Sequence, residues 1–322
     1  MSSSLSSWFV AALLVCGVAS AAAHDGKPDC GSGETPLLSF VQFASLSVAT
    51  SPPSLLTVKG KLSLPQQGEH HLGCTRVNGR KLPAVVILHG SSGVDARGDF
   101  YEAALNAAGI ATLQIDMWEA RGVGGAVSRP AAPIFTLPDA YSALAFLAAR
   151  PEIDAARIGV LGFSWGGVNS LATAERLYTS MFGNGRQFKA HVAHYPVCYA
   201  ANAVIPGMPT PAQLGTQFLN LTGAPVLVQV GGLDGYDNGV ERCRSLAQAV
   251  NGVNADVVQV VGYPGAQHAF DRLMVPIVVS DPFGNEGSYF RSGVVPRVTL
   301  APDVDQAYQA RDRAVRFLRK AL

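Results

Sequence analysis

The sequence lacks a surplus of charge of either sign. Its 24 Lys and Arg residues balance 23 Asp and Glu residues, and only 15% of the chain is charged. Nucleic-acid-binding proteins need a basic surface for phosphates, and proteins that bind anionic lipids need a polybasic segment. We therefore expect neither nucleic acid nor a lipid surface as a partner, and a small organic molecule as the substrate.

Internal repeats are also lacking, as is any change in composition that would mark a second domain. This excludes the repeat architectures, in which a unit of 20 to 50 residues recurs. The chain has 322 residues and is 48% hydrophobic, so it is long enough to bury a large core. We expect a single globular domain over residues 37–322.

A hydrophobic run long enough to span a membrane is missing near the N-terminus. The apolar run from Trp8 to Ala19 is shorter than the roughly 20 residues of a spanning helix. Small residues follow at 19, 21 and 23, as a signal peptidase requires. We predict a signal peptide at 1–23, a short extension at 24–36, and export to the periplasm or the medium. A membrane anchor is the alternative, and no Lys or Arg precedes Trp8.

Cysteine is scarce, and its number is even once a signal peptide is removed. The four cysteines that remain are Cys30, Cys74, Cys198 and Cys243. Disulfides persist outside the cytoplasm, so two bridges are expected, although three pairings and free buried thiols stay open. Glu69 with His70 and His71 falls short of a zinc ligand set, so we expect no metal.

Short apolar segments rich in β-branched residues alternate with helical segments along most of the chain. The run Pro83–Gly90 is continuously apolar, which is typical of a strand buried on both faces of a parallel sheet. This alternation predicts one α/β domain with a mostly parallel central sheet flanked by helices. The predicted strands cover 37–48, 54–65, 83–90, 110–116, 157–163, 189–196, 224–232 and 255–264.

Helices are predicted over 101–109, 138–150, 165–178 and 304–322. The last one spaces Tyr308, Val315, Leu318 and Leu322 at helical intervals, with Arg and Lys between them. Such a pattern predicts an amphipathic helix docked on the sheet. The segment 273–300 is rich in Pro and Gly, and we interpret it as a loop insertion that is either a lid or a surface segment.

The stretch "GFSWGG", from Gly162 to Gly167, joins a predicted buried strand to a predicted helix. In a nucleophile elbow a serine lies in a strained turn at such a junction, and the flanking glycines avoid collisions in the tight backbone. We therefore predict that Ser164 is a nucleophile. A glycine-rich structural bend is the alternative.

A serine nucleophile needs a base and an acid, which follow it along the chain in this kind of sheet. Asp234 comes just after a predicted buried strand, and His268 follows the next strand. We predict that both act with Ser164. Asp237 and Asp271 are the competing acids, and either could instead be a turn residue.

Donors for a developing oxyanion are expected from two backbone N–H groups. Trp165 follows the nucleophile, and Ser91 lies in "LHGSSG" after an earlier strand. A plain glycine turn is the alternative there. We also name two residues that could bind substrate: His89, and Arg121, which could hold a carboxylate unless it pairs with Glu119 or is solvated.

These residues resemble the dienelactone hydrolase family of α/β-hydrolases. The resemblance rests on "RIGVLGFSWGG", "GGLD", "YPGAQHAFD" and the closing "ARDRAVRFL". It implies an α/β-hydrolase fold, a triad of Ser164, Asp234 and His268, an oxyanion hole of Ser91 and Trp165, and no cofactor. The founding members have a cysteine where this chain has Ser164, and a glutamate in the loop that reads "HGSSGVDAR". The implied activity is therefore broader hydrolysis of carboxylic esters or lactones.

Secreted relatives with a "YPxC" stretch and a cysteine soon after the triad acid are similar to this chain. Here those cysteines are Cys198 and Cys243. The resemblance implies that these two pair, which leaves Cys30 and Cys74 to each other. A serine peptidase, a polyester hydrolase and a non-catalytic binding protein with the same fold are the alternative functions.

Overall fold

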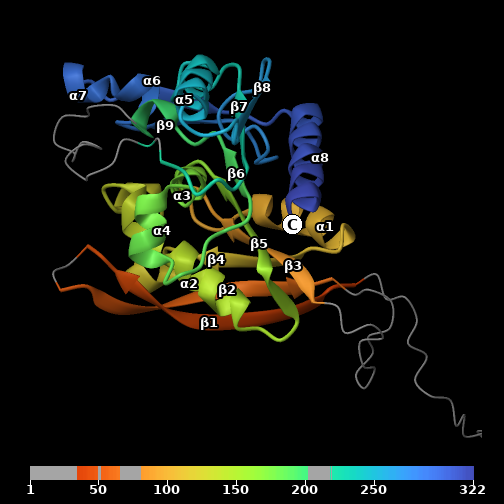
Figure 1. Cartoon of the computed structure of the whole chain (residues 1–322). Helices are drawn as coiled ribbons and strands as arrows, with labels where there is room; N and C mark the ends of the chain where they lie inside the picture. The colour runs from red at the N-terminus through yellow and green to blue at the C-terminus, as the bar shows by residue number, and fades with distance from the viewer. Residues whose placement is uncertain (1–34, 50–51, 66–80, 202–217, 219) are drawn as a thin grey trace, which may run out of the picture.

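The computed structural model describes residues 35–49, 52–65, 81–201, 218 and 220–322. Its centre is an eight-stranded sheet with the order β1-β2-β4-β3-β5-β6-β7-β8 (Figure 1). Strands β3 to β8 run parallel, whereas β2 is antiparallel to both β1 and β4. The predicted α/β fold with a mostly parallel sheet is confirmed.

All eight predicted strands are present, with ends that shift by a few residues. Each one is apolar enough to be buried on one or both faces of the sheet, as a covered α/β sheet requires. The strands are β1 Leu37–Ser47, β2 Ser54–Leu64, β3 Leu82–Leu88, β4 Ala111–Asp116, β5 Ile153–Phe163, β6 His191–His194, β7 Val226–Gly231 and β8 Val258–Tyr263.

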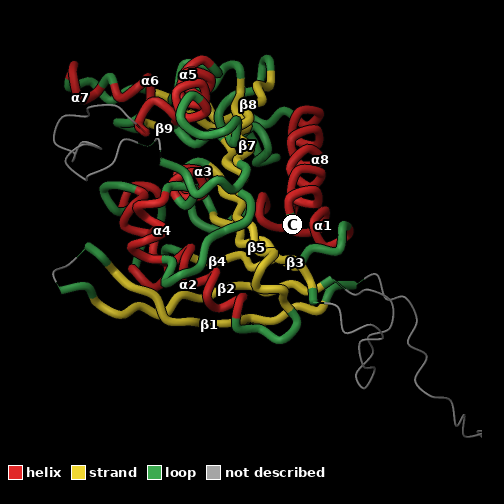
Figure 2. The backbone as a smooth tube through the Cα atoms, in the orientation of Figure 1, coloured by secondary structure: helices red, strands yellow, loops and turns green. Residues whose placement is uncertain are grey.

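Helices cover both faces of the sheet, as the alternating side chains of the central strand β3 require (Figure 2). Val85 and Ile87 of β3 belong to a core with helices α1 (Ala96–Ala107) and α8 (Val304–Ala321). Val86 and Leu88 belong to a second core with helix α2 (Leu137–Ala148). Successive residues of a strand point to opposite faces, so one apolar strand serves two cores.

Two helix predictions need correction. The single helix expected over 165–178 is two helices, α3 (Trp165–Ala172) and α4 (Arg176–Phe182), because Glu175 forms a β-bridge with Leu221 between them. Helix α8 is docked on the core as expected, with Leu318 buried and Val315 and Leu322 packed against it. Tyr308, however, is exposed, and the other buried residues of the helix are Ala307, Ala310 and Ala314. Small alanines let this helix lie close to the sheet, which the spacing of large residues did not reveal.

The segment 273–300 has secondary structure of its own, which we did not predict. Strands β9 (Ile277–Ser280) and β10 (Arg297–Leu300) form a two-stranded antiparallel sheet, and the short helices α6 (Gly284–Gly287) and α7 (Tyr289–Ser292) lie between them. We call this segment the insertion. The insertion, drawn in blue in Figure 1, lies at the end of the molecule that carries the teal helix α5 (Glu241–Asn251).

The predicted signal peptide, most of the predicted extension, Cys30 and Cys74 lie outside the described residues. Among the helices that are described, none is both long enough and apolar enough to cross a membrane.

Candidate active site

Ser164 lies in a tight turn between β5 and α3, with a backbone conformation that a serine rarely adopts. Its φ is 49° and its ψ is −108°. A Cβ atom at Gly162 would lie 1.9 Å from the carbonyl oxygen of Gly166, and one at Gly166 would lie 2.3 Å from that of Leu88. Only glycine fits at these two positions, so the turn has the strained geometry of a nucleophile elbow.

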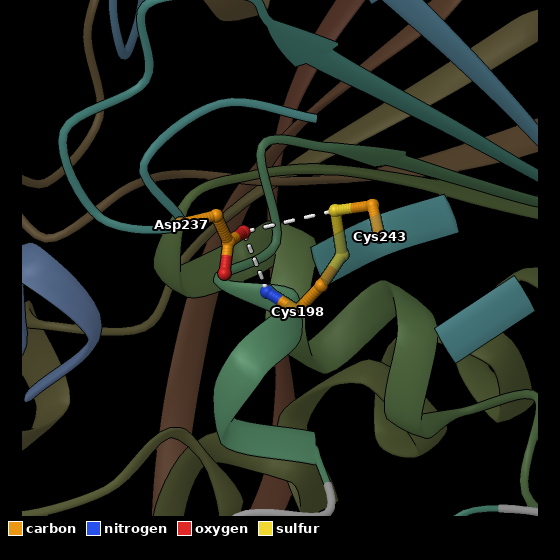
Figure 3. Close-up of side chains that lie close together, drawn as sticks. All are labelled: Cys198, Asp237 and Cys243. Atoms are coloured by element: carbon orange, nitrogen blue, oxygen red, sulfur yellow. Dashed lines mark hydrogen bonds between the residues drawn. A yellow bond between two sulfur atoms is a disulfide. The ribbon is translucent and has the colours of Figure 1, made fainter. Parts of the chain in front are cut away.

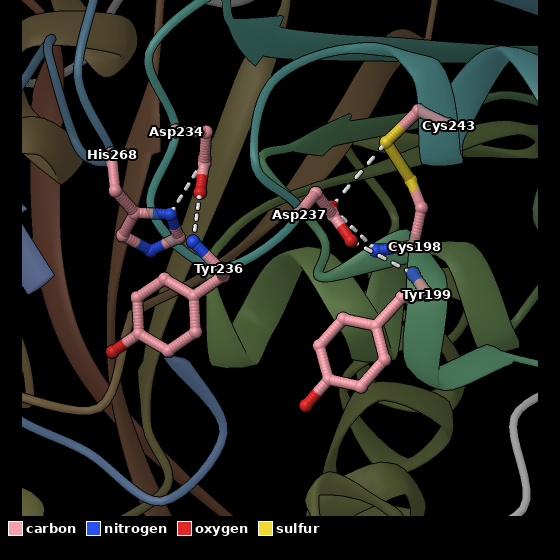
Figure 4. The surroundings of a disulfide bond; sticks show 7 residues. All are labelled: Cys198, Tyr199, Asp234, Tyr236, Asp237, Cys243 and His268. Carbon is pink, nitrogen blue, oxygen red and sulfur yellow. Dashed lines mark hydrogen bonds and ion pairs between the residues drawn. A yellow bond between two sulfur atoms is a disulfide. The ribbon is translucent and has the colours of Figure 1, made fainter. Parts of the chain in front are cut away.

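Three side chains from three different loops form a hydrogen-bonded chain in the structure. His268 Nε2 is 2.9 Å from Ser164 Oγ. The other ring nitrogen, His268 Nδ1, is 2.7 Å from Asp234 Oδ2 (Figure 4). Asp234 and His268 are both almost fully buried. The imidazole therefore faces the hydroxyl with one nitrogen and the carboxylate with the other, which is the arrangement of a serine nucleophile with its base and acid.

The two competing acids have other partners. Asp271 accepts hydrogen bonds from the hydroxyls of Tyr101 and Tyr195. Asp237 accepts from the backbone amides of Cys198 and Tyr199. Among the three candidates, Asp234 is the one that the structure brings to His268.

Of the two predicted oxyanion donors, Trp165 directly follows Ser164 along the chain, and Ser91 lines the same cavity as Ser164. Trp165 is the first residue of α3, where N–H groups have no partner within the helix. Ser91 lies in the tight turn that the Gly93 amide closes on the Gly90 carbonyl. The amide of Gly166 donates to the carbonyl of His89, so the elbow and this turn are joined directly.

A cavity of about 360 Å³ opens in front of Ser164 and His268. Its polar lining includes Ser91, Ser92 and the arginines at 97, 129 and 272. Its apolar lining comes from Ala126, Val127, Pro130 and Ala131 and from the insertion. Such a cavity is large enough for a small organic molecule. The insertion is thus part of its wall, through Val279, Phe283 and Leu300 among others.

A disulfide joins Cys198 to Cys243 beside Asp237 (Figure 3), which lies in the same loop as Asp234. It connects the turn after β6 to α5, and both cysteines are buried. The ligand atoms of Asp237 and the two cysteines lie within 4.8 Å of one another, but the two sulfurs are bonded to each other. The pairing implied by the family resemblance is therefore present in the structure.

The three residues of the hydrogen-bonded chain also lie in a region that matches a known protein family. The sequence profile of the dienelactone hydrolase family matches residues 73–280, which include Ser164, Asp234 and His268. The chain belongs to the dienelactone hydrolase family. A search of curated proteins found no match.

Solved structures share the fold of this dienelactone hydrolase family member at low identity. The dienelactone hydrolase of Anabaena variabilis is 17% identical, with a TM-score of 0.54, and the match covers 89% of this chain and 99% of that one. A butyrate-bound esterase of Thermogutta terrifontis is 17% identical, with a TM-score of 0.56, and the match covers 86% and 94%. A dienelactone hydrolase-like promiscuous phosphotriesterase from metagenomic libraries is 17% identical, with a TM-score of 0.50 and coverage of 88% and 98%.

Two residues that we expected at the substrate site of this family member lie elsewhere. Arg121 donates two hydrogen bonds to the buried carboxylate of Asp139 and one to the carbonyl of Met117. His89 is buried, its Nδ1 is 2.7 Å from the carbonyl of Gly90, and its Nε2 accepts from the amide of Met117. Burial lowers the pKa of His89 to about 4. Neither side chain is among the residues that line the cavity at Ser164.

Three arginines that we did not predict line the cavity: Arg97 and Arg129, which are paired with Asp95 and Asp281, and Arg272. Arg272 lies four residues after His268, and its Nε is buried with no hydrogen-bond partner among the described residues. The same Nε is 3.7 Å from Asp95 Oδ2. The sequence signal for Arg272 was its place directly after the stretch "YPGAQHAFD". The direction of its side chain depends on the turn around Ala269, which has a positive φ of 56°.

Proposed function

We propose that this family member is an exported serine hydrolase that cleaves carboxylic esters or lactones through an acyl-enzyme. The observation that carries this proposal is the hydrogen-bonded chain from Ser164 through His268 to Asp234 at the edge of the cavity. Membership of the dienelactone hydrolase family supports the same class of reaction. The Cys198–Cys243 disulfide is compatible with export.

In the proposed reaction, His268 Nε2 takes the proton of Ser164 as Oγ attacks the carbonyl carbon of the ester. Asp234 holds the imidazole through Nδ1 and stabilises the imidazolium that forms. The amides of Trp165 and Ser91 donate to the oxyanion. His268 then protonates the leaving alcohol, and a water molecule releases the acyl group by the same steps.

Arg272 supports a narrower substrate class within this proposal. Its guanidinium lines the cavity and has only a long 3.7 Å ion pair to Asp95, whereas Arg97 and Arg129 have carboxylate partners at 2.6 and 2.8 Å. Such a guanidinium can bind a carboxylate through charge-assisted hydrogen bonds. We therefore propose that small esters or lactones with a carboxylate group are preferred over neutral ones of the same size.

The test is hydrolysis of a panel of p-nitrophenyl acyl esters by the mature protein, beside Ser164→Ala. We expect turnover by the wild type and a loss of about a thousandfold or more in the variant. If both proteins are inert across ester, lactone and peptide substrates, the hydrolase proposal fails and a binding role replaces it. Turnover of peptides but not esters would support the peptidase alternative.

A further inference from the structure

Two tyrosine rings contact the imidazole of His268. The ring of Tyr195 is 4.7 Å away between centroids, and that of Tyr236 is 4.3 Å away. The hydroxyl of Tyr195 donates to Asp271 at 2.5 Å, and the hydroxyl of Tyr236 donates to Asp281 at 2.9 Å. Each ring that touches the histidine is thus held by a buried carboxylate.

The two carboxylates come from different parts of the chain. Asp271 is the last residue of the stretch "YPGAQHAFD" that contains His268, whereas Asp281 belongs to the insertion, immediately after β9. Asp281 is 4% exposed and also accepts two contacts from Arg129 Nη2, at 2.8 and 2.9 Å. The guanidinium of Arg129 in turn lies over the ring of Trp165, 5.6 Å from its centroid. The insertion therefore reaches the histidine and the oxyanion residue through this one carboxylate.

The main chain of the insertion is also bound to the loop of the candidate acid. Asn285 N donates to the carbonyl of Gly235, and Glu286 N donates to that of Tyr236, both at 2.8 Å. The amide of Tyr236 donates to Asp234 Oδ1, also at 2.8 Å (Figure 4). Tyr236 therefore links the insertion to both the acid and the base of the proposed triad.

We propose that Tyr236 is a positioning residue whose place is set by Asp281, so that docking of the insertion aligns His268 with Ser164 and Asp234. This proposal rests on the proposed hydrolase function. A proton that moves from Ser164 Oγ to His268 Nε2 breaks the O–H bond, forms an N–H bond and leaves an imidazolium. Aromatic faces attract cations, so the Tyr236 ring stabilises this ion only while the ring is held in place.

The charges around His268 also decide how readily its imidazolium forms. Asp234, Ser164 and the two tyrosines face the imidazole directly. Behind Tyr195, Arg97 donates to the tyrosine oxygen opposite Asp271, and behind Tyr236, Asp281 is paired with Arg129. On the Tyr195 side Arg97 is also paired with Asp95, which lies 3.7 Å from Arg272, so the charges on both sides are paired with charges of opposite sign. Loss of the Asp281 charge leaves Arg129 uncompensated, and a nearby positive charge disfavours the imidazolium.

The first experiment compares Tyr236→Phe, Asp281→Asn and the double variant with the wild type. We expect each single change to lower kcat about tenfold with KM altered less than threefold, because near-attack alignment is lost. The kcat of the double variant should equal that of the slower single variant, because both changes break the same hydrogen bond between Tyr236 and Asp281. If the two single losses in kcat multiply in the double variant, the proposal is overturned.

Tyr199→Phe is the matched control. The Tyr199 hydroxyl donates to the carbonyl of Phe283 in the insertion, but the residue has no contact with His268 among the described interactions. We expect its kcat to stay within twofold of wild type. A loss equal to that of Tyr236→Phe would mean that general anchoring of the insertion matters, and would overturn the specific role of Tyr236.

A second measurement separates this proposal from the proposed function. The ring-proton resonances of His268 are recorded by NMR in histidine-labelled protein, with the assignment made by His268→Gln. Asp281→Asn should shift these resonances, because the Tyr236 ring lies 4.3 Å from the imidazole and loses the hydrogen bond that holds it, whereas Tyr199→Phe should leave them unchanged. If wild-type turnover does not depend on Ser164, the proposed function fails, and the NMR shifts still decide the role of Asp281. Identical His268 shifts in Asp281→Asn and wild type would overturn it.

Discussion

Asp237 accepts a 2.8 Å hydrogen bond from the amide of Cys198, so the loop that carries Asp234 is fastened to the disulfide. The other carboxylate oxygen accepts from the amide of Tyr199, also at 2.8 Å. Cys198 is bonded to Cys243 at the start of α5. Asp237 lies only three residues after Asp234, so this connection restricts the position of the candidate acid.

The disulfide should contribute a large part of the stability of the folded chain. It closes a loop of 45 residues, for which the chain-entropy treatment gives about 4 kcal/mol. The Cys198→Ser, Cys243→Ser double variant should therefore unfold at a lower denaturant concentration than wild type, as measured by circular dichroism. Reductant should lower the midpoint of wild type but not of the variant; equal responses would contradict the prediction.

Asp237 should make stability fall as the pH rises toward neutrality. Burial and the neighbouring charge of Asp234 raise the pKa of Asp237 to about 7. Between the ordinary aspartate value near 4 and pH 7, the folded protein keeps a proton that the unfolded chain has lost. This group alone then lowers the free energy of unfolding by up to about 1.4 kcal/mol per pH unit.

Asp237→Asn should remove that contribution, and urea unfolding at pH 5 and 7.5 measures it. Wild type should lose more stability than the variant over this interval. Burial lowers the pKa of His191 and His194 to about 4, so these two histidines make the free energy of unfolding rise with pH. Their contribution is the same in wild type and variant, and it cancels in the comparison. Parallel curves would show that Asp237 is ionised throughout.

The strain at Ser164 should appear as a stability difference between two inactive variants. Ser164→Gly and Ser164→Ala both remove the hydroxyl, but glycine adopts a φ of 49° and a ψ of −108° far more readily than alanine. The glycine variant should be more stable by about 1 kcal/mol, measured by thermal or urea unfolding. An alanine variant of equal or greater stability would contradict the strained elbow.

Arg272 should discriminate between charged and neutral substrates. Arg272→Ala should raise KM for an ester that bears a carboxylate by about 10- to 100-fold, because a charged hydrogen bond contributes about 1.5 to 3 kcal/mol. The matching methyl amide, which has no charge, should be hydrolysed equally well by both proteins. If the two substrates are affected alike, Arg272 has a structural role.

The strands could be predicted from the sequence because their signal is local. An apolar run such as Val85–Leu88 is buried on both faces of a parallel sheet wherever that sheet lies, so its composition already reports its surroundings. Ser164 carried a similar local signal, since the collisions at Gly162 and Gly166 arise within one turn and against the adjacent strand. The insertion carried none, because its two strands have only four residues each.

The sequence by itself determined the α/β architecture, the elbow at Ser164 and the order in which acid and base follow it. Only the tertiary structure decided which carboxylate meets His268, since Asp234, Asp237 and Asp271 are chemically alike and differ in their partners. It also placed Arg121 against Asp139 and Arg272 in the cavity. Long charged side chains have many rotamers, and their directions depend on partners that lie far away along the chain.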